Sequence, residues 1–261
     1  MMRRVALCTG VELAVRESGR GEPVVLLHAW GETHRSFDRL VPLLPPSLQL
    51  VMPDLRGVGE SSKPPGGYSL SEAGEDVVAL LDAVGMESCW LVGTSSGGYL
   101  AQQVAVAHPE RVHGLVLIGA PSTLQGPVPA WLSELLASFH DPVTRNDLLG
   151  LDRALPLRVP VPDSFLDDQS TSALTIPRSV WIAAGEALFA AEPPLSRAPI
   201  AAPTLILWGA DDEVLPRQQA DDLRAAIAGS RLVVYEDTGH LVLWERPERV
   251  AADLSAFIPT P

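Results

Sequence analysis

Cysteine and basic side chains are scarce in this sequence of 261 residues. Its two cysteines, Cys8 and Cys89, both lie in apolar runs typical of strands, so we expect reduced, buried thiols rather than a disulfide. The sequence has 19 lysines and arginines and 32 aspartates and glutamates, which gives a net charge of −13. An acidic surface repels nucleic acid and anionic membranes, so we expect neither as a partner and favour a small neutral molecule.

Long hydrophobic runs and metal-binding clusters are also missing. Arg3 and Arg4 resemble the charged start of a signal peptide, but only residues 5–8 follow as an apolar run, and no stretch is long enough to cross a bilayer. Together with the expected reduced cysteines, this predicts a cytoplasmic protein. No Cys and His cluster has metal-ligand spacing and no G-x-x-x-x-G-K phosphate loop is present, so we expect no metal and no other cofactor.

Residues 93–97, Gly-Thr-Ser-Ser-Gly, fit G-x-S-x-G, a pattern that places a serine at a tight turn between a strand and a helix. Glycines two positions before and after the serine leave room where the strand and the helix pass each other, and they tolerate a strained backbone. Ser96 does not fit this frame because Thr94 stands two positions before it. Ser95 is therefore the candidate nucleophile, and the alternative is a chance match in a glycine-rich loop.

Short apolar runs alternate with helical patterns along most of the chain. The helical patterns lie at residues 37–44, 70–84, 99–108, 217–227 and 250–257, and Ser69 with Glu72 predicts a capping box at the second of them. The economical architecture is α/β, with a mostly parallel eight-stranded sheet and helices on both faces. The predicted strands are residues 5–8, 11–15, 23–27, 48–52, 89–92, 112–118, 203–208 and 232–235, of which the first two form a hairpin.

The alternation stops between Pro121 and Pro199, where no strand is predicted. Apolar residues from Val128 to Phe139 recur at the spacing of an amphipathic helix, and further short helical pieces lie between prolines. A long structureless loop is improbable inside a compact domain. We therefore expect residues 121–199 to form a helical cap, inserted into a core made of residues 1–120 and 200–261.

Two loops at predicted strand ends carry further polar candidates. Residues 209–213 read Gly-Ala-Asp-Asp-Glu, and residues 236–240 read Glu-Asp-Thr-Gly-His. In open α/β sheets, sites lie outside the carboxyl ends of the strands. Ser95, Asp212 and His240 all fall at such ends, in the order Ser, Asp, His.

On these residues the chain resembles the α/β-hydrolase superfamily over essentially its whole length. His28-Ala29-Trp30 looks like the family's oxyanion segment, residues 54–61 resemble its D-x-R-G-x-G-x-S loop, and residues 93–97 its nucleophile turn. Residues 209–212 are similar to its G-x-x-D acid loop and residues 239–240 to its Gly-His loop. The resemblance implies the α/β-hydrolase fold and a catalytic triad, which would consist of Ser95, Asp212 and His240. The G-x-x-D spacing selects Asp212 over Asp211.

The chemistry of these residue types supports the same roles. A serine hydroxyl is a weak nucleophile, so His240 must remove its proton and return it to the leaving group, while Asp212 fixes the imidazole tautomer. The backbone N–H groups of Trp30 and Ser96 would form an oxyanion hole, with a contribution of roughly 3 to 4 kcal/mol from each donor. We expect His28 to shape the oxyanion loop.

Several activities are compatible with this set of residues. An aspartate at the nucleophile turn marks dehalogenases and epoxide hydrolases in this superfamily, so Ser95 disfavours both. We expect a serine hydrolase, a carboxylic ester hydrolase or lactonase, that cleaves small to medium, largely apolar esters or lactones through an acyl-enzyme intermediate. The alternatives are a C–C bond hydrolase of the meta-cleavage-product type, a cofactor-free perhydrolase or haloperoxidase, and, outside enzymes, a small-molecule receptor on the same fold. A monomer and a homodimer are equally compatible.

The predicted cap supplies apolar side chains that should roof the nucleophile. Burying a substrate carboxylate there is costly without an arginine, and the sequence places none of Arg145, Arg153, Arg158 and Arg178 in the pocket. We therefore expect faster cleavage of uncharged substrates. The expected pocket residues are Trp30, Tyr99, Trp131, Leu135, Phe139 and Trp181.

Overall fold

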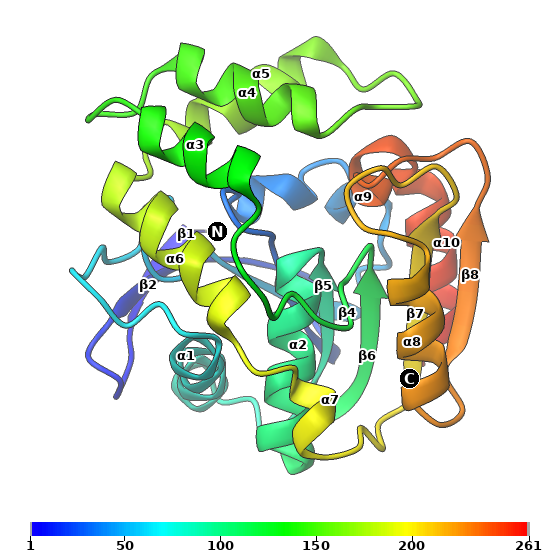
Figure 1. Ribbon diagram of the computed structural model, residues 1–261. Coiled ribbons are helices and arrows are strands. Elements are labelled where there is room, and N and C mark those ends of the chain that lie inside the picture. The colour runs from blue at the N-terminus through cyan, green and yellow to red at the C-terminus, as the bar shows by residue number, and fades with distance from the viewer. Residues whose placement is uncertain (1, 260–261) are drawn as a thin grey trace.

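The computed structural model describes residues 2–259 and is built on one eight-stranded sheet (Figure 1). The strand order is β1-β2-β4-β3-β5-β6-β7-β8. Strand β2 is antiparallel to both of its neighbours, β1 and β4, whereas the six strands β3 to β8 are parallel to one another. This confirms the mostly parallel eight-stranded sheet. The strands are β1 (Met2–Ala6), β2 (Glu12–Ser18), β3 (Glu22–Leu27), β4 (Leu48–Pro53), β5 (Cys89–Thr94), β6 (Val112–Ile118), β7 (Thr204–Gly209) and β8 (Arg231–Tyr235).

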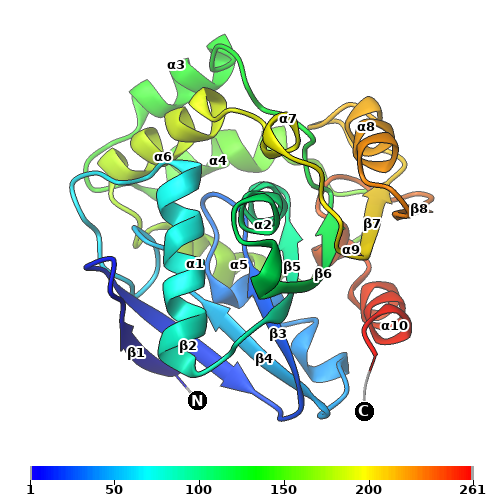
Figure 2. The ribbon, with the colours of Figure 1, turned by 90° about the horizontal axis from the view of Figure 1, so that it is seen from below.

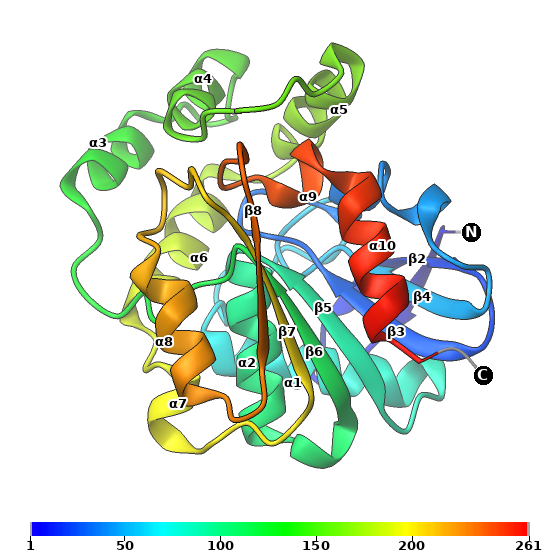
Figure 3. The same ribbon diagram turned by 90° about the vertical axis from the view of Figure 1, so that its right-hand side faces the viewer.

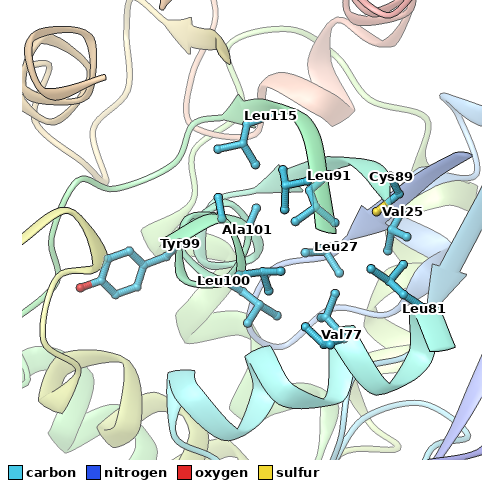
Figure 4. Packing of buried hydrophobic residues seen from close by; sticks show 14 of the residues in the cluster. Val25, Leu27, Val77, Leu81, Cys89, Leu91, Tyr99, Leu100, Ala101 and Leu115 are labelled. Atoms are coloured by element: carbon cyan, nitrogen blue, oxygen red, sulfur yellow. The ribbon is translucent and has the colours of Figure 1, made fainter. Parts of the chain in front are cut away.

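The central strands send successive side chains into two separate cores, because neighbouring residues of a strand point to opposite faces. Val25 and Leu27 pack in one core, shown in Figure 4, whereas Val24 and Leu26 pack in the other. Figures 2 and 3 show α10 on the face opposite to α1, α2 and α8. Helices thus cover both faces, as predicted: α1 (Leu70–Val84), α2 (Ser96–Ala107) and α8 (Gln218–Ala226) on one, and α10 (Pro247–Phe257) on the other.

The first long helix begins and ends where its sequence dictates. The Ser69 hydroxyl accepts from the Glu72 N–H and the Glu72 carboxylate accepts from the Ser69 N–H, so the predicted capping box is confirmed. Gly85 ends α1 in the left-handed conformation with φ of 73°, which glycine adopts without steric cost.

The segment between β6 and β7, which the structure describes in full, contains five helices and no strand. In Figure 1, α3, α4 and α5 lie beyond the ends toward which the parallel strands point. Apolar side chains of the segment form a third cluster, which includes Leu136, Phe139, Leu148 and Trp181. The helices of the segment are α3 (Ala130–Ser138), α4 (Arg145–Ala154), α5 (Asp163–Ala173), α6 (Arg178–Ala190) and α7 (Pro194–Arg197).

Two local expectations are wrong. The helical pattern at residues 37–44 folds as two short 3-10 turns, His34–Phe37 and Val41–Leu43, because Pro42 has no N–H with which to continue a helix. Cys8 is exposed in the turn after β1, whereas Cys89 is buried on β5 as expected. Within the apolar run of residues 5–8, pairing with β2 ends at Ala6, because the chain reverses direction at Gly10, which has φ of 86°.

Candidate active site

Ser95 occupies the strained turn between β5 and α2. Its φ of 48° lies in the left-handed region that side chains other than glycine rarely adopt, and its N–H donates to the Ile118 carbonyl at 2.8 Å. A Cβ atom at Gly93 would collide with the Gly97 carbonyl, and one at Gly97 would collide with the Leu27 carbonyl. The two glycines of the pattern are therefore required by the close approach of β3, β5 and α2.

Three side chains from separate loops meet at this turn. His240 Nε2 lies 3.0 Å from Ser95 Oγ, and His240 Nδ1 lies 2.8 Å from Asp212 Oδ2. The other oxygen of Asp212 accepts the N–H groups of Val214 at 2.8 Å and Leu215 at 2.9 Å. The side chains of His240 and Asp212 are 4% and 1% exposed, so water does not compete for these hydrogen bonds.

The loops that carry Asp212 and His240 touch directly. A Cβ atom at Gly209 would collide with the Gly239 carbonyl, so only glycine allows the two loops to approach. Asp211, the neighbour that the spacing disfavours, is exposed and its N–H donates to the Thr238 carbonyl. The structure thus brings Asp212, and not Asp211, to His240.

Glu245 on the short helix α9 (Val242–Glu245) links the histidine loop to the inserted helical segment. Its buried carboxylate accepts from the N–H groups of Gly239 at 3.0 Å, Arg158 at 3.0 Å and Val159 at 2.8 Å. No sequence pattern predicts a role for Glu245. The only local signal was an acidic residue on an otherwise apolar run after His240, which does not reveal partners more than 80 positions away.

The predicted oxyanion segment, residues 28–30, is held by hydrogen bonds to three side chains, those of His28, Glu32 and Ser96. His28 Nδ1 donates to the Ala29 carbonyl at 2.8 Å and His28 Nε2 accepts the Leu55 N–H at 3.0 Å, which fixes a neutral imidazole and agrees with its expected shaping role. The Ala29 N–H donates to Glu32 at 3.1 Å. The Trp30 N–H donates to Ser96 Oγ at 2.7 Å.

This buried imidazole makes stability depend on pH. Burial lowers the pKa of His28 below 6.5, and the hydrogen bond to Ala29 only partly opposes the shift. Below pH 6.5 the unfolded chain binds a proton that the folded protein refuses, so the free energy of unfolding should fall as the pH drops, by up to about 1.4 kcal/mol per pH unit. Urea unfolding of the wild type and of His28→Gln between pH 7.5 and 5.5 tests this, and equal pH slopes would contradict it.

A cavity of about 360 Å³ lies between the oxyanion segment and the inserted helices. Of the residues that the structure describes, no lysine or arginine lines it, whereas Glu32 and Asp152 do, and partial removal from water raises the pKa of both carboxyl groups. Its walls are Trp30, Gly31, Glu32, Leu148, Leu151, Asp152, Leu155, Pro156, Leu157, Leu166, Gln169, Ser170, Ala173, Trp181, Leu241 and Trp244. A smaller cavity of about 90 Å³ shares Trp30 and Gly31 with it and extends to Ser96.

Of the six expected pocket residues, only Trp30 and Trp181 line the larger cavity. Trp131 is 52% exposed, because it lies on the solvent side of α3. Tyr99 is fully buried in the core, and Figure 4 shows its ring extending from α2 away from the labelled strand residues. Leu135 and Phe139 pack among the inserted helices instead. The expectation is therefore wrong for these four residues with respect to this cavity.

Four arginines of the inserted segment, Arg145, Arg153, Arg158 and Arg178, are absent from the walls of this cavity. Arg145 pairs with Asp167, and Arg158 pairs with Glu213. Arg178 donates to the Phe139 and Ala137 carbonyls, while Arg153 is exposed. Within residues 2–259, no helix is long and apolar enough to cross a membrane, and no group of three or more His, Cys, Asp or Glu side chains is placed to hold a metal ion.

Comparison with known proteins places this site in a family. Residues 22–247 match the model of the alpha/beta hydrolase fold, so the chain belongs to the α/β-hydrolase family and is a hydrolytic enzyme. It is 27% identical to 2-hydroxymuconate semialdehyde hydrolase of Pseudomonas sp. (strain CF600), over 98% of this chain and 93% of that protein. It is 28% identical to pimeloyl-[acyl-carrier protein] methyl ester esterase of Aeromonas hydrophila, over 95% and 100% of the two chains.

A similar solved structure is that of an enzyme described as degrading N-acyl homoserine lactone. It superposes with a TM-score of 0.82 and 28% sequence identity, over 98% of this chain and 100% of that chain. The relatives thus include an esterase, a lactone-degrading enzyme and a hydrolase of a semialdehyde. The three names give different substrates, namely a semialdehyde, a methyl ester and a lactone.

Proposed function

We propose that this protein is a serine hydrolase that cleaves uncharged, largely apolar esters or lactones through an acyl-enzyme. The observation that carries the proposal is the continuous chain of contacts from Ser95 Oγ through His240 to the carboxylate of Asp212. That arrangement is the one in which a serine is activated by a histidine base whose tautomer an acid fixes. In this proposal residues 1–120 and 200–261 form the catalytic core, and residues 121–199 act as a cap.

The reaction has two stages. Ser95 Oγ attacks the acyl carbon while its proton passes to His240 Nε2, and the carbonyl oxygen becomes an oxyanion held by donors at the N-terminus of α2. His240 then gives the proton to the departing alcohol, and the C–O bond of the ester breaks. A water molecule next transfers a proton to His240 and attacks the acyl-enzyme, which releases the acid and restores the Ser95 hydroxyl.

The walls of the larger cavity favour an uncharged acyl group. Leucines and tryptophans supply most of its surface, and its titratable side chains are the acids Glu32 and Asp152. A substrate carboxylate placed there would lose water without gaining a cation and would lie near two acids. A neutral apolar group loses only unfavourable contact with water.

A C–C bond hydrolase is the second candidate, because one relative carries the name 2-hydroxymuconate semialdehyde hydrolase. For the meta-cleavage type, a carboxylate-bearing substrate would need a cationic partner near the nucleophile. Among the described residues no arginine or lysine lines the larger cavity, which favours ester or lactone hydrolysis over this reaction.

A pair of matched substrates distinguishes ester or lactone hydrolysis from C–C bond hydrolysis. We expect kcat/KM for a neutral ester to exceed that for the same ester with a free carboxylate on its acyl group by at least about tenfold, equivalent to about 1.4 kcal/mol of transition-state stabilisation. Asp152→Asn should narrow this ratio because it removes an acid from the cavity wall, whereas Asp167→Asn, on the exposed face of α5, should leave it unchanged. A preference for the carboxylate-bearing substrate would place C–C hydrolysis first.

A further inference from the structure

The hydroxyl of Ser96, which follows the nucleophile in the chain, lies at the oxyanion hole. Its oxygen accepts the Trp30 N–H at 2.7 Å, across 66 positions of sequence. That N–H is one of the two donors expected to hold the oxyanion directly. The side chain of Ser96 therefore takes the acceptor position that a direct contact would give to the acyl oxygen.

The other expected donor is open. Ser96 is the first residue of α2, so its N–H has no partner inside the helix, and no acceptor for it is found within residues 2–259. The Ser96 O–H proton likewise has no acceptor in the described part of the chain. Ser96 thus has two hydrogen-bond donors without an acceptor among the described residues, its N–H and its O–H, at the N-terminus of α2, where the helix dipole favours negative charge.

The oxyanion segment cannot easily turn to expose the Trp30 N–H. The His28 ring is fixed by Ala29 and Leu55, and the Ala29 N–H is bound by Glu32. The Trp30 indole N–H donates to the Trp181 carbonyl at 3.2 Å, and the two rings pack edge to face. The Ser96 side chain, in contrast, is partly exposed, borders the smaller cavity and moves by rotation about a single bond.

We propose that the Ser96 hydroxyl is a catalytic residue that donates its proton in a hydrogen bond to the oxyanion. The Trp30 N–H then acts through Ser96 Oγ, and its hydrogen bond polarises the O–H group, which strengthens the donation. No proton is transferred at this step. The inference rests on the proposed acyl transfer at Ser95, and it replaces the expected direct contact between Trp30 and the oxyanion.

Substitution of Ser96 separates this role from simple obstruction. If the hydroxyl donates, Ser96→Ala should lower kcat by about tenfold or more with little change in KM, because the interaction forms only in the transition state. Ser96→Thr, which keeps the hydroxyl, should stay within a few-fold of the wild type. If the hydroxyl only blocks the Trp30 N–H, Ser96→Ala should be as active as the wild type or more active, and the proposal fails.

Binding of an alkyl trifluoromethyl ketone, which forms a tetrahedral oxyanion with a serine, gives an independent readout. Its affinity should fall in Ser96→Ala in proportion to kcat/KM, whereas the thermal midpoint of unfolding should change little. An unchanged affinity would overturn the proposal. A wild type without esterase activity and without labelling of Ser95 by a fluorophosphonate would instead contradict the proposed function itself, so the two failures are distinguishable.

Discussion

Ser95→Ala is expected to lower kcat for ester hydrolysis by at least about a thousandfold, the scale found when members of such a triad are removed. The loss follows because alanine leaves His240 with no hydroxyl to deprotonate at its 3.0 Å contact. The variant should stay folded, since the Ser95 side chain makes no capping hydrogen bond to α2. Steady-state kinetics and thermal unfolding measure the two effects.

The matched control is Ser71→Ala, which removes an exposed serine on α1 that lines neither of the two cavities described above. Its kcat should equal that of the wild type. A fluorophosphonate should label the wild type and Ser71→Ala but not Ser95→Ala. Labelling that persists in Ser95→Ala, or activity within tenfold of the wild type, would show that another residue is the nucleophile.

Asp212→Asn is expected to lower kcat by on the order of ten-thousandfold, as in the comparable aspartate-to-asparagine change of a serine protease triad. The structure explains why an amide cannot substitute. The Val214 and Leu215 N–H groups require an oxygen at the Oδ1 position, so the amide NH₂ must face His240. His240 Nδ1 then becomes an acceptor, and its proton moves to Nε2, where it prevents removal of the Ser95 proton.

Asp211→Asn supplies the control in the same loop. Asp211 is exposed and its backbone, not its carboxylate, bonds to the histidine loop, so this variant should keep at least half of the wild-type activity. A larger loss in Asp211→Asn than in Asp212→Asn would mean that the acid of the triad has been assigned to the wrong residue.

Features set by neighbouring residues could be predicted from the sequence. The capping box of Ser69 and Glu72 acts over three positions, and the glycines around Ser95 act over two. The alternation in β3, with Val24 and Val25 in different cores, follows from strand geometry alone. These elements are correct because local sterics and hydrogen bonds determine them.

Features set by packing between distant segments could not be predicted from the sequence. Trp131 has the spacing of a buried helical face, yet it is exposed because nothing covers that side of α3. Two of the three hydrogen-bond donors to Glu245 lie in the inserted segment, and Ser96 accepts from Trp30, which is 66 positions away in the sequence. Hydrophobic periodicity shows which face of a helix is apolar but does not show which neighbour covers that face.

The central claim is that the acyl group of the substrate is carried by Ser95. Mass spectrometry of the enzyme, stopped with acid in the first turnovers of an activated ester, tests it directly. We predict a mass increase equal to the acyl group, located on the peptide that contains Ser95 and formed at the rate at which the alcohol is first released. Acyl groups on any other residue, or alcohol release in a first turnover that leaves Ser95 unmodified, would contradict the account.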